Sequence, residues 1–259
     1  MATYLDNILA AHRAAAALDE RPLDELVERA VALPPARGFR AALERDGAER
    51  LAVISEIKRR SPSKGDLNIG LDPAVLAAVY EHAGASCLSV LTDVEFFGGS
   101  EADLQAARGA TGLPAIRKDF TVSERDVCDA RLMGADCVLL IAAALAPVEL
   151  LRFHRLAIEI GLDVLVEVHD EVELDVAMAA GATLVGVNQR DLVTFQVDHE
   201  RAVRVAGVMP AGVVRVAESG VRHAADATSL RAAGYHAILV GETLVTAADP
   251  AETLRSLRV

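Results

Sequence analysis

Charged and polar side chains stand at the ends of several short apolar segments of this sequence. Glu56 and Lys58 close the segment Leu51–Ile57, and their spacing of two places both on the same face of a strand. Other segments of this kind end with acids, cations and amides, at Arg117-Lys118-Asp119, Glu167, Asn188-Gln189-Arg190 and Glu218. A buried charge is costly unless it is paired or takes part in chemistry. Converging carboxylates and ammonium groups therefore predict a site for general acid–base catalysis.

The distribution of lysine supports this prediction. Among 26 lysine and arginine residues, only Lys58, Lys64 and Lys118 are lysine. Two of them stand at the ends of the apolar segments, where an ammonium group with an adjustable pKa is useful for proton transfer. Lys64, in the Ser61–Gly65 loop, is interpreted as a solvated lysine, and His169, directly after Val164–Val168, as a loop residue.

Serine and glycine follow the last two apolar segments. Ser219 and Gly220 come after Val213–Ala217, and Gly241 comes directly after Ala237–Val240. In parallel barrels the loops at these two positions commonly bind phosphate through backbone N–H groups. The pattern predicts a small phosphorylated substrate.

Motifs for metals and common cofactors are absent from the sequence. The histidines form no HExxH motif, and Cys87, Cys128 and Cys137 form no CxxC pair. The chain also lacks GxGxxG after a strand, a GxxxxGK[ST] loop and GxSxG. We therefore expect no metal and no cofactor, and we expect the three cysteines to be packing residues.

Eight apolar, β-rich segments would position the polar residues, and longer stretches with helical periodicity, such as Pro73–Ala83 and Pro147–Ile160, separate them. The segments are Leu51–Ile57, Ser86–Leu91, Pro114–Arg117, Cys137–Ile141, Val164–Val168, Leu184–Val187, Val213–Ala217 and Ala237–Val240. This alternation in 259 residues predicts an α/β fold, a closed (β/α)8 TIM barrel. A doubly wound open sheet is the alternative, because strand count alone does not prove closure.

Three helical patterns precede the first strand-like segment, at Tyr4–Leu18, Leu23–Leu33 and Phe39–Glu44. They contribute no strand, and they could cover the floor of the barrel or fold toward its mouth. We expect one (β/α)8-barrel domain over residues 1–259, with an N-terminal helical extension at 1–50 and the barrel at 51–259.

Composition excludes several classes of partner. A net charge of −12, no tryptophan and 3% aromatic residues provide neither a basic surface nor a stacking platform for nucleic acid. The longest apolar stretch, Cys137–Val148, is shorter than the roughly 20 residues that span a bilayer. The first 17 residues are amphipathic, unlike a signal peptide. These features favour a cytoplasmic protein, a monomer or weak homo-oligomer, that binds neither nucleic acid nor membrane.

The run Glu56-Ile57-Lys58-Arg59-Arg60-Ser61-Pro62-Ser63 resembles the E-x-K-x-x-S-P-S signature of indole-3-glycerol phosphate synthases. The resemblance continues in register from about Leu51 to the C-terminus, through Phe96–Ser100, Arg117–Phe120, Leu165–Val168, Gly186–Leu192 and Ala217–Gly220. It implies a cofactor-free carbon–carbon lyase of tryptophan biosynthesis. In that reaction 1-(2-carboxyphenylamino)-1-deoxyribulose 5-phosphate loses CO2 and water and closes to indole-3-glycerol phosphate.

The resemblance also implies roles for individual residues. Lys118 would be the general acid in ring closure, and Glu167 would transfer protons in the later dehydration. Lys58 would assist loss of the hydroxyl, while Glu56 holds the lysines charged. Asn188 and Glu218 would bind sugar hydroxyls and ammonium groups, and Arg190 would bind a carboxylate or the phosphate. The remaining predicted contacts are Ser61, Ser219, Gly220 and Gly241 for phosphate, and Phe97, Phe120, Leu139, Ile141 and Leu192 for the anthranilate ring.

One departure concerns the phosphate site. Many members of the family have serine directly after the glycine that matches Gly241, whereas this chain has Glu242. We expect the Glu242 side chain to turn away and to leave only its backbone N–H for the anion.

Two other functions are compatible with the sequence. Another phosphate-binding barrel, such as a phosphoribosylanthranilate isomerase, would share the fold but would not need Glu56, Lys58, Lys118 and Glu167 together. A catalytically silent barrel that serves as a binding partner is the second alternative.

Overall fold

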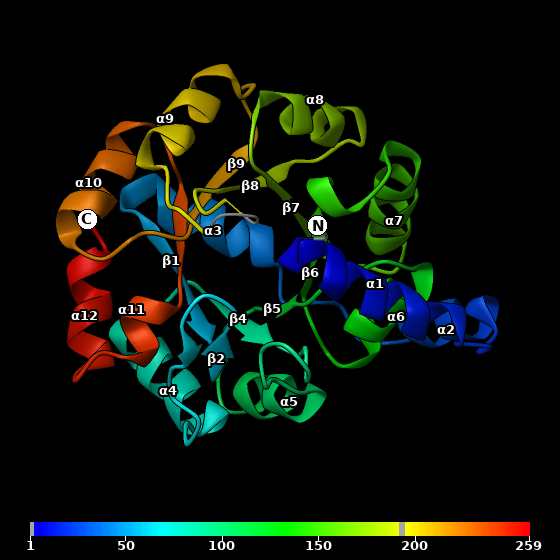
Figure 1. Cartoon of the computed structure of the whole chain (residues 1–259). Helices are drawn as coiled ribbons and strands as arrows, with labels where there is room; N and C mark the ends of the chain where they lie inside the picture. The colour runs from blue at the N-terminus through cyan, green and yellow to red at the C-terminus, as the bar shows by residue number, and fades with distance from the viewer. Residues whose placement is uncertain (1–2, 192–194) are drawn as a thin grey trace.

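Eight parallel strands close into a barrel in the order β1-β10-β9-β8-β7-β6-β5-β4 in the computed structural model, which describes residues 3–191 and 195–259 (Figure 1). The strands are β1 (Ala52–Ile57), β4 (Cys87–Leu91), β5 (Ala115–Lys118), β6 (Cys137–Ile141), β7 (Asp163–Val168), β8 (Leu184–Asn188), β9 (Val214–Glu218) and β10 (Ala237–Val240). The predicted (β/α)8 barrel is confirmed, and the open sheet is excluded by the β1–β10 pairing.

Helices surround the barrel, and most begin where the sequence supplies a capping residue. The N-cap side chains of Asp72, Ser100, Ser123, Asp170, Asp198 and Asp249 accept backbone N–H groups of the first helical turn. The helices are α1 (Tyr4–Ala17), α2 (Leu23–Val31), α3 (Phe39–Glu49), α4 (Pro73–Ala83), α5 (Glu101–Gly109), α6 (Glu124–Leu132), α7 (Pro147–Glu159), α8 (Glu171–Ala179), α9 (His199–Val208), α10 (Ala224–Ala232), α11 (Glu242–Val245) and α12 (Pro250–Leu257). None of the helices in the described ranges is long and apolar enough to cross a membrane.

Short elements that the apolar pattern did not predict lie close to the mouth of the barrel. A two-stranded hairpin, β2 (Arg60–Ser61) with β3 (Gly65–Asp66), follows β1, and a 3-10 turn at Ala142–Ala144 follows β6. These pieces are too short to show a hydrophobic period, so sequence patterning does not reveal them.

Apolar residues form two layers, one inside the barrel and one between the strands and the surrounding helices. The inner layer includes Ile54, Ile116, Leu139 and Leu165, all buried. The outer layer is larger and joins the opposite faces of the strands to the helices. Strands buried on both faces explain the continuous apolar runs in the sequence. Cys87, Cys128 and Cys137 are free and buried, which confirms the packing interpretation.

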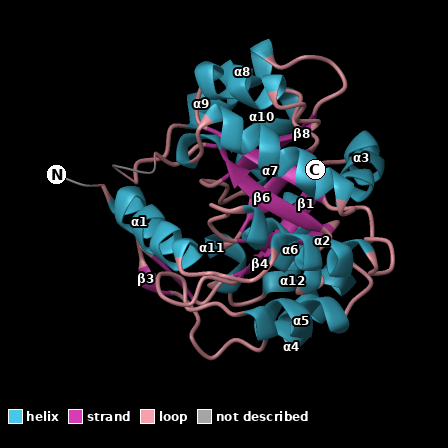
Figure 2. Cartoon of the chain, turned by 90° about the vertical axis from the view of Figure 1, so that its right-hand side faces the viewer, coloured by secondary structure: helices cyan, strands magenta, loops and turns pink. Residues whose placement is uncertain are grey.

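The N-terminal helices take both of the positions that the sequence left open. Phe39 and Leu43 of α3 are fully buried against the first residues of several strands, so α3 closes the floor of the barrel. Helix α1 lies at the opposite end, as Figure 2 shows, where Leu5 and Ile8 line the pocket at the mouth. Helix α1 is therefore part of the wall of the candidate site.

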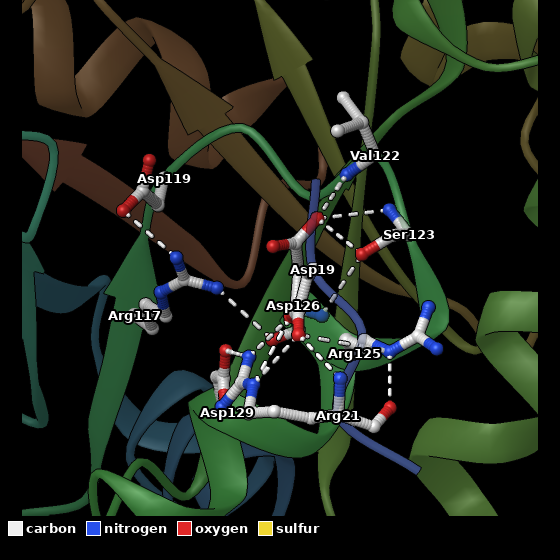
Figure 3. A network of polar contacts seen from close by, with 9 residues as sticks. All are labelled: Asp19, Arg21, Arg117, Asp119, Val122, Ser123, Arg125, Asp126 and Asp129. Atoms are coloured by element: carbon white, nitrogen blue, oxygen red, sulfur yellow. Dashed lines mark hydrogen bonds and ion pairs between the residues drawn. The ribbon is translucent and has the colours of Figure 1, made fainter. Parts of the chain in front are cut away.

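Ion pairs fasten the segment that follows α1 to the outside of the barrel (Figure 3). Arg21 pairs with Asp129 of α6 at 2.7 Å, and Arg125 donates to the carbonyl of Arg21 at 2.7 Å. On α1 itself, Arg13 pairs with Glu149 of α7 at 3.0 Å. These contacts hold α1 in place across the mouth.

Candidate active site

The strand register brings the predicted acids and amides together at the carboxyl end of the barrel. Asn188 is paired with Glu218 on the neighbouring strand, and Glu167 is paired with Gly186. One pocket opens at this end, and fifteen of the sixteen predicted site residues line it: Glu56, Lys58, Ser61, Phe97, Lys118, Phe120, Leu139, Ile141, Glu167, Asn188, Arg190, Glu218, Ser219, Gly220 and Gly241. The sixteenth, Leu192, lies outside the described residues.

Lys118 lies between two buried carboxylates at the centre of the pocket. Its Nζ is 3.3 Å from Glu167 Oε2 and 3.7 Å from Glu218 Oε2. Asn188 Nδ2 donates to the other oxygen of Glu167 at 3.0 Å. Glu167 is therefore held from two sides, and Lys118 Nζ is aimed at the space above the strands.

Burial and charge set the protonation states in this cluster. Burial alone would lower the pKa of Lys118, but Glu167, Glu218 and Glu56 outweigh it and raise that pKa above its ordinary value. Burial would raise the pKa of Glu167, but Lys118, His169 and the Asn188 hydrogen bond outweigh it and lower that pKa. Burial, together with the negative charge of Glu167, raises the pKa of Glu218. Near neutrality the site thus combines a protonated amine with an ionised carboxylate.

A second acid–lysine pair stands on β1. Lys58 Nζ is hydrogen-bonded to Glu56 Oε1, and Ser89 Oγ lies 3.4 Å from the other carboxylate oxygen of Glu56. Lys58 keeps 16% of its side chain exposed, whereas Glu56 keeps 5%. The ammonium group therefore reaches into the pocket while its carboxylate partner stays beneath it.

Two glycines make room for these carboxylates. A Cβ at Gly186 would collide with Glu218 Oε1, and a Cβ at Gly241 would collide with Glu56 Oε1. A side chain at either position would displace a charged group of the site, so the glycines are part of its geometry.

The loops after β1, β9 and β10 form a polar end of the pocket. Ser219 has a φ of 66°, which strains a non-glycine residue, and Gly220 follows at 77°. Ser61 Oγ is buried and has no hydrogen-bond partner in the described part of the chain. An unsatisfied hydroxyl beside strained backbone fits an anion-binding end, where a ligand would supply the missing partner.

The expectation for Glu242 is wrong. Its side chain does not turn away, because one carboxylate oxygen is 3.8 Å from Lys64 Nζ and the other is 3.7 Å from a terminal nitrogen of Arg190. Glu242 begins α11 directly after Gly241 of the predicted phosphate site, where cations of two other loops face it. The positive charges of Lys64 and Arg190 attract the Glu242 carboxylate and keep it from pointing into solvent. Lys64 is half-exposed, as expected, but it is an ion-pair partner.

The opposite wall of the pocket is apolar and aromatic. The rings of Phe97 and Phe120 lie 6.2 Å apart, and Leu139 and Ile141 complete this wall from β6. The sequence did not identify the residues that α1 adds, Tyr4, Leu5 and Ile8, or Phe195 from the loop after β8. The amphipathic pattern of α1 was visible, but nothing in it indicated which surface the apolar face would cover.

His12 of α1 holds the helix against the loops after β4 and β5. Its Nε2 is 2.9 Å from Asp93 Oδ2 and 3.9 Å from Asp119 Oδ1. This is the one group of side chains in residues 3–191 and 195–259 whose atoms are spaced to hold a metal ion. Their oxygens already serve the protein, since Asp93 Oδ1 accepts two backbone N–H groups and Asp119 Oδ2 accepts from Arg117. We interpret the group as a clamp for α1.

The clamp should make stability depend on pH. Burial lowers the pKa of His12, but its contacts with Asp93 and Asp119 outweigh burial and raise it above 6.5. The resulting stabilisation is complete below about pH 6.5 and disappears as the pH rises through the raised pKa. His12→Gln is expected to lower the Tm by roughly 2–4 °C at pH 5.5, the effect of about 1 kcal/mol, and by less at pH 8.5.

Thermal melts of both proteins at the two pH values would check this prediction. His82→Gln, at an exposed position in the last turn of α4, removes only a charge near a helix end, and this control should lower the Tm at pH 5.5 by less than His12→Gln. An equal loss at pH 5.5 and pH 8.5 would show that the charge of His12 does not hold α1.

Comparison with known proteins agrees with the site. The family model described as indole-3-glycerol phosphate synthase matches residues 5–257. The chain is 51% identical over 233 residues to indole-3-glycerol phosphate synthase 2 of Streptomyces coelicolor, covering 90% of this chain and 89% of that protein. It is 47% identical over 249 residues to the indole-3-glycerol phosphate synthase of Chlorobium luteolum, covering 95% of each.

Solved structures that resemble the chain at low identity share its fold. A thiamine phosphate pyrophosphorylase from Pyrococcus furiosus aligns with a TM-score of 0.59 at 17% identity, over 82% of this chain and 95% of that one. A native KDPGal structure aligns with a TM-score of 0.56 at 17% identity, over 80% and 92%. These likenesses support the barrel alone. The family match over nearly the whole chain and the two relatives show that the chain belongs to the indole-3-glycerol phosphate synthase family.

Proposed function

We propose that the chain closes the indole ring of 1-(2-carboxyphenylamino)-1-deoxyribulose 5-phosphate with loss of CO2 and water, and that the pocket at the barrel mouth does this without metal or cofactor. The observation that carries the proposal is the position of Lys118, with Nζ 3.3 Å from Glu167 and 3.7 Å from Glu218. A protonated amine between carboxylates, at the base of a pocket with one apolar and one polar end, suits acid-catalysed attack on a carbonyl.

In the first step Lys118 acts as the general acid. The substituted ring carbon attacks the substrate carbonyl, and Lys118 Nζ delivers a proton to the carbonyl oxygen as the carbon–carbon bond forms. Loss of CO2 then restores the aromatic ring. The neighbouring carboxylates favour the charged amine before the step, which keeps the proton available at neutral pH.

The later dehydration uses the remaining charged groups. Glu167 accepts the proton from the carbon beside nitrogen, and Lys58 assists departure of the hydroxyl as water. Glu56 orients Lys58 through their hydrogen bond. Asn188 fixes the orientation of Glu167, and Glu218 binds a sugar hydroxyl or the Lys118 ammonium group.

The two ends of the pocket match the two ends of the substrate. Ser61, Ser219, Gly220 and Gly241 surround the phosphate, with Arg190 on a substrate carboxylate or the phosphate. The anthranilate ring lies against Phe97, Phe120, Leu139 and Ile141, with Leu5 and Ile8 from α1 above it. Leu192 is proposed for the same wall on the family resemblance.

We further propose that the protein is a cytoplasmic monomer or weak homo-oligomer. It would form one domain over 1–259 and bind no nucleic acid.

Product analysis tests this function against its nearest alternative. Purified protein in EDTA would be given the carboxyphenylamino substrate in one reaction and phosphoribosylanthranilate in another. We expect indole-3-glycerol phosphate from the first and no conversion of the second. Conversion of phosphoribosylanthranilate alone would identify an isomerase, and binding of either compound without turnover would indicate a silent barrel.

The position of Glu242 predicts an effect on phosphate affinity. The carboxylate of Glu242 is paired with Lys64 and Arg190, and it repels an incoming phosphate. Removing it in Glu242→Ser should therefore lower the KM roughly fivefold, which corresponds to about 1 kcal/mol at this half-exposed site. The value of kcat should change little, because the ion pairs of Glu242 are with Lys64 and Arg190, which take no part in the proposed proton transfers. Glu252→Ser, on exposed α12, is the control. A KM that rises in Glu242→Ser would mean that the carboxylate orders the two cations for the substrate.

A further inference from the structure

His169 joins a carboxylate of the active site to a carboxylate at the outer rim of the barrel. It follows β7 and stands two residues after Glu167, with Nε2 3.7 Å from Glu167 Oε1. Its other ring nitrogen, Nδ1, is 3.0 Å from Oε2 of Glu173 on α8. The three side chains form a row of groups that can carry protons, with one gap wider than a hydrogen bond, between His169 and Glu167.

Solvent exposure increases along this row from the active site to the rim of the barrel. Glu167 keeps 2% of its side chain exposed, His169 keeps 11%, and Glu173 keeps 23%. The oxygen of Glu173 that meets the ring also accepts the backbone N–H of His169 at 2.8 Å, so this end of the imidazole is fixed. Nε2 is buried and has no hydrogen-bond partner within the described residues, which leaves it facing Glu167.

The reaction requires a proton from solvent in every turnover. The substrate enters with an ionised carboxylate, which leaves as neutral CO2, while the hydroxyl leaves as neutral water. Two protons are therefore delivered to oxygen and one is removed from carbon, so one net proton is consumed. Lys118 must regain its proton after ring closure, Lys58 must regain its own after dehydration, and Glu167 must lose the proton that it takes from carbon. Substrate or product in the pocket blocks the mouth, so water cannot deliver a proton to Lys118 from that side.

On the basis of the function proposed above, we propose that Glu173 and His169 are the proton relay that recharges Glu167 and Lys118 from solvent during turnover. A proton from water enters at the Glu173 carboxylate and passes to His169 Nδ1. The ring releases the proton on Nε2 to Glu167 Oε1, and Glu167 passes one from Oε2 to the neutral amine of Lys118, 3.3 Å away. The proton that Glu167 later takes from carbon leaves by the reverse route, from Glu167 to Nε2 and from Nδ1 to Glu173, which restores the starting tautomer. Lys58 regains its proton from water when the product leaves the pocket.

The local electrostatics suit a relay. Burial lowers the pKa of His169, but the hydrogen bond to Glu173 and the charge of Glu167 outweigh it and raise that pKa. Arg201 of α9 is the opposing cation, and it lies against the carbonyl of Asn188. Imidazole then gains and loses protons near neutral pH. Closing the gap from 3.7 Å to hydrogen-bond reach, about 3.2 Å, needs only a small side-chain shift.

The test compares the first turnover with steady turnover in His169→Gln. The first turnover uses protons already on the lysines, so its rate constant should stay within about twofold of wild type. Steady-state kcat should fall roughly tenfold, with a burst of product and an increased solvent deuterium isotope effect, since a proton-transfer step becomes limiting. Added imidazole buffer should restore part of kcat, and Glu173→Gln should show the same pattern more weakly.

Glu171→Gln, an exposed acid on the same helix, is the matched control and should leave kcat unchanged. If first-turnover and steady-state rate constants fall together in His169→Gln, and imidazole restores nothing, the residue holds structure and the relay is wrong. If the wild-type protein is active and His169→Gln has the same kcat, the relay is wrong although the proposed function stands. A wild-type protein that forms no indole product would overturn the proposed function itself, and the relay with it.

Discussion

Lys118→Ala is expected to lower kcat by roughly 100-fold or more, the usual contribution of a general acid. The amine is a protonated group placed between Glu167 and Glu218, and its loss also leaves these two buried groups without their cation. Rates of indole formation at saturating substrate would measure the effect. KM should change by much less than kcat, because the phosphate and ring contacts remain.

Two further variants separate acid catalysis from general loss of charge. Lys118→Arg keeps a positive charge but cannot give up its proton near neutral pH, so it should remain nearly as slow as the alanine variant. Arg155→Ala, an exposed cation on α7, should keep wild-type activity. Near-normal kcat in Lys118→Ala would remove this residue from the mechanism.

Glu167→Gln should also lower kcat by roughly 100-fold or more, because the amide cannot accept the proton in dehydration. The amide is nearly the same size and still meets Asn188, so folding should be preserved, as a melting curve would show. The 3-hydroxyindoline intermediate that precedes dehydration should accumulate, and rapid quenching with mass analysis would detect it. Glu159→Gln, on the exposed side of α7, is the control.

An outcome with slow substrate consumption and no intermediate would contradict the assignment of Glu167 to dehydration. It would place the carboxylate in the first step, where it would act by holding Lys118 charged.

The barrel strands were predictable because each is buried on both faces and bounded by polar residues. The apolar runs such as Cys137–Ile141 and Ala237–Val240 coincide with β6 and β10. The start of α10 at Ala224 could not be predicted, because alanine and aspartate in its first turn give no clear apolar period. The apolar pattern did not mark α9 and α12, because segments rich in charged residues give a weak pattern.

The residues of the site could be predicted, but their distances could not. Position at a strand end identifies Glu56, Lys118 and Glu218, whereas the contacts between them depend on how closure of the barrel staggers neighbouring strands. The place of α1 and the pairing of Glu242 depend on contacts between segments far apart in sequence. The role proposed for His169 was hidden for the same reason, since Glu173 is near it in sequence but the approach of Glu167 is not visible in the sequence.

The most direct test of the central claim is the stoichiometry of the wild-type reaction. Purified protein in EDTA, without added cofactor, would be incubated with 1-(2-carboxyphenylamino)-1-deoxyribulose 5-phosphate while indole fluorescence and released CO2 are followed together. We predict one CO2 for each indole-3-glycerol phosphate formed, over many turnovers. Folded protein that binds the substrate but releases neither product would contradict the account and leave a phosphate-binding barrel with a different reaction.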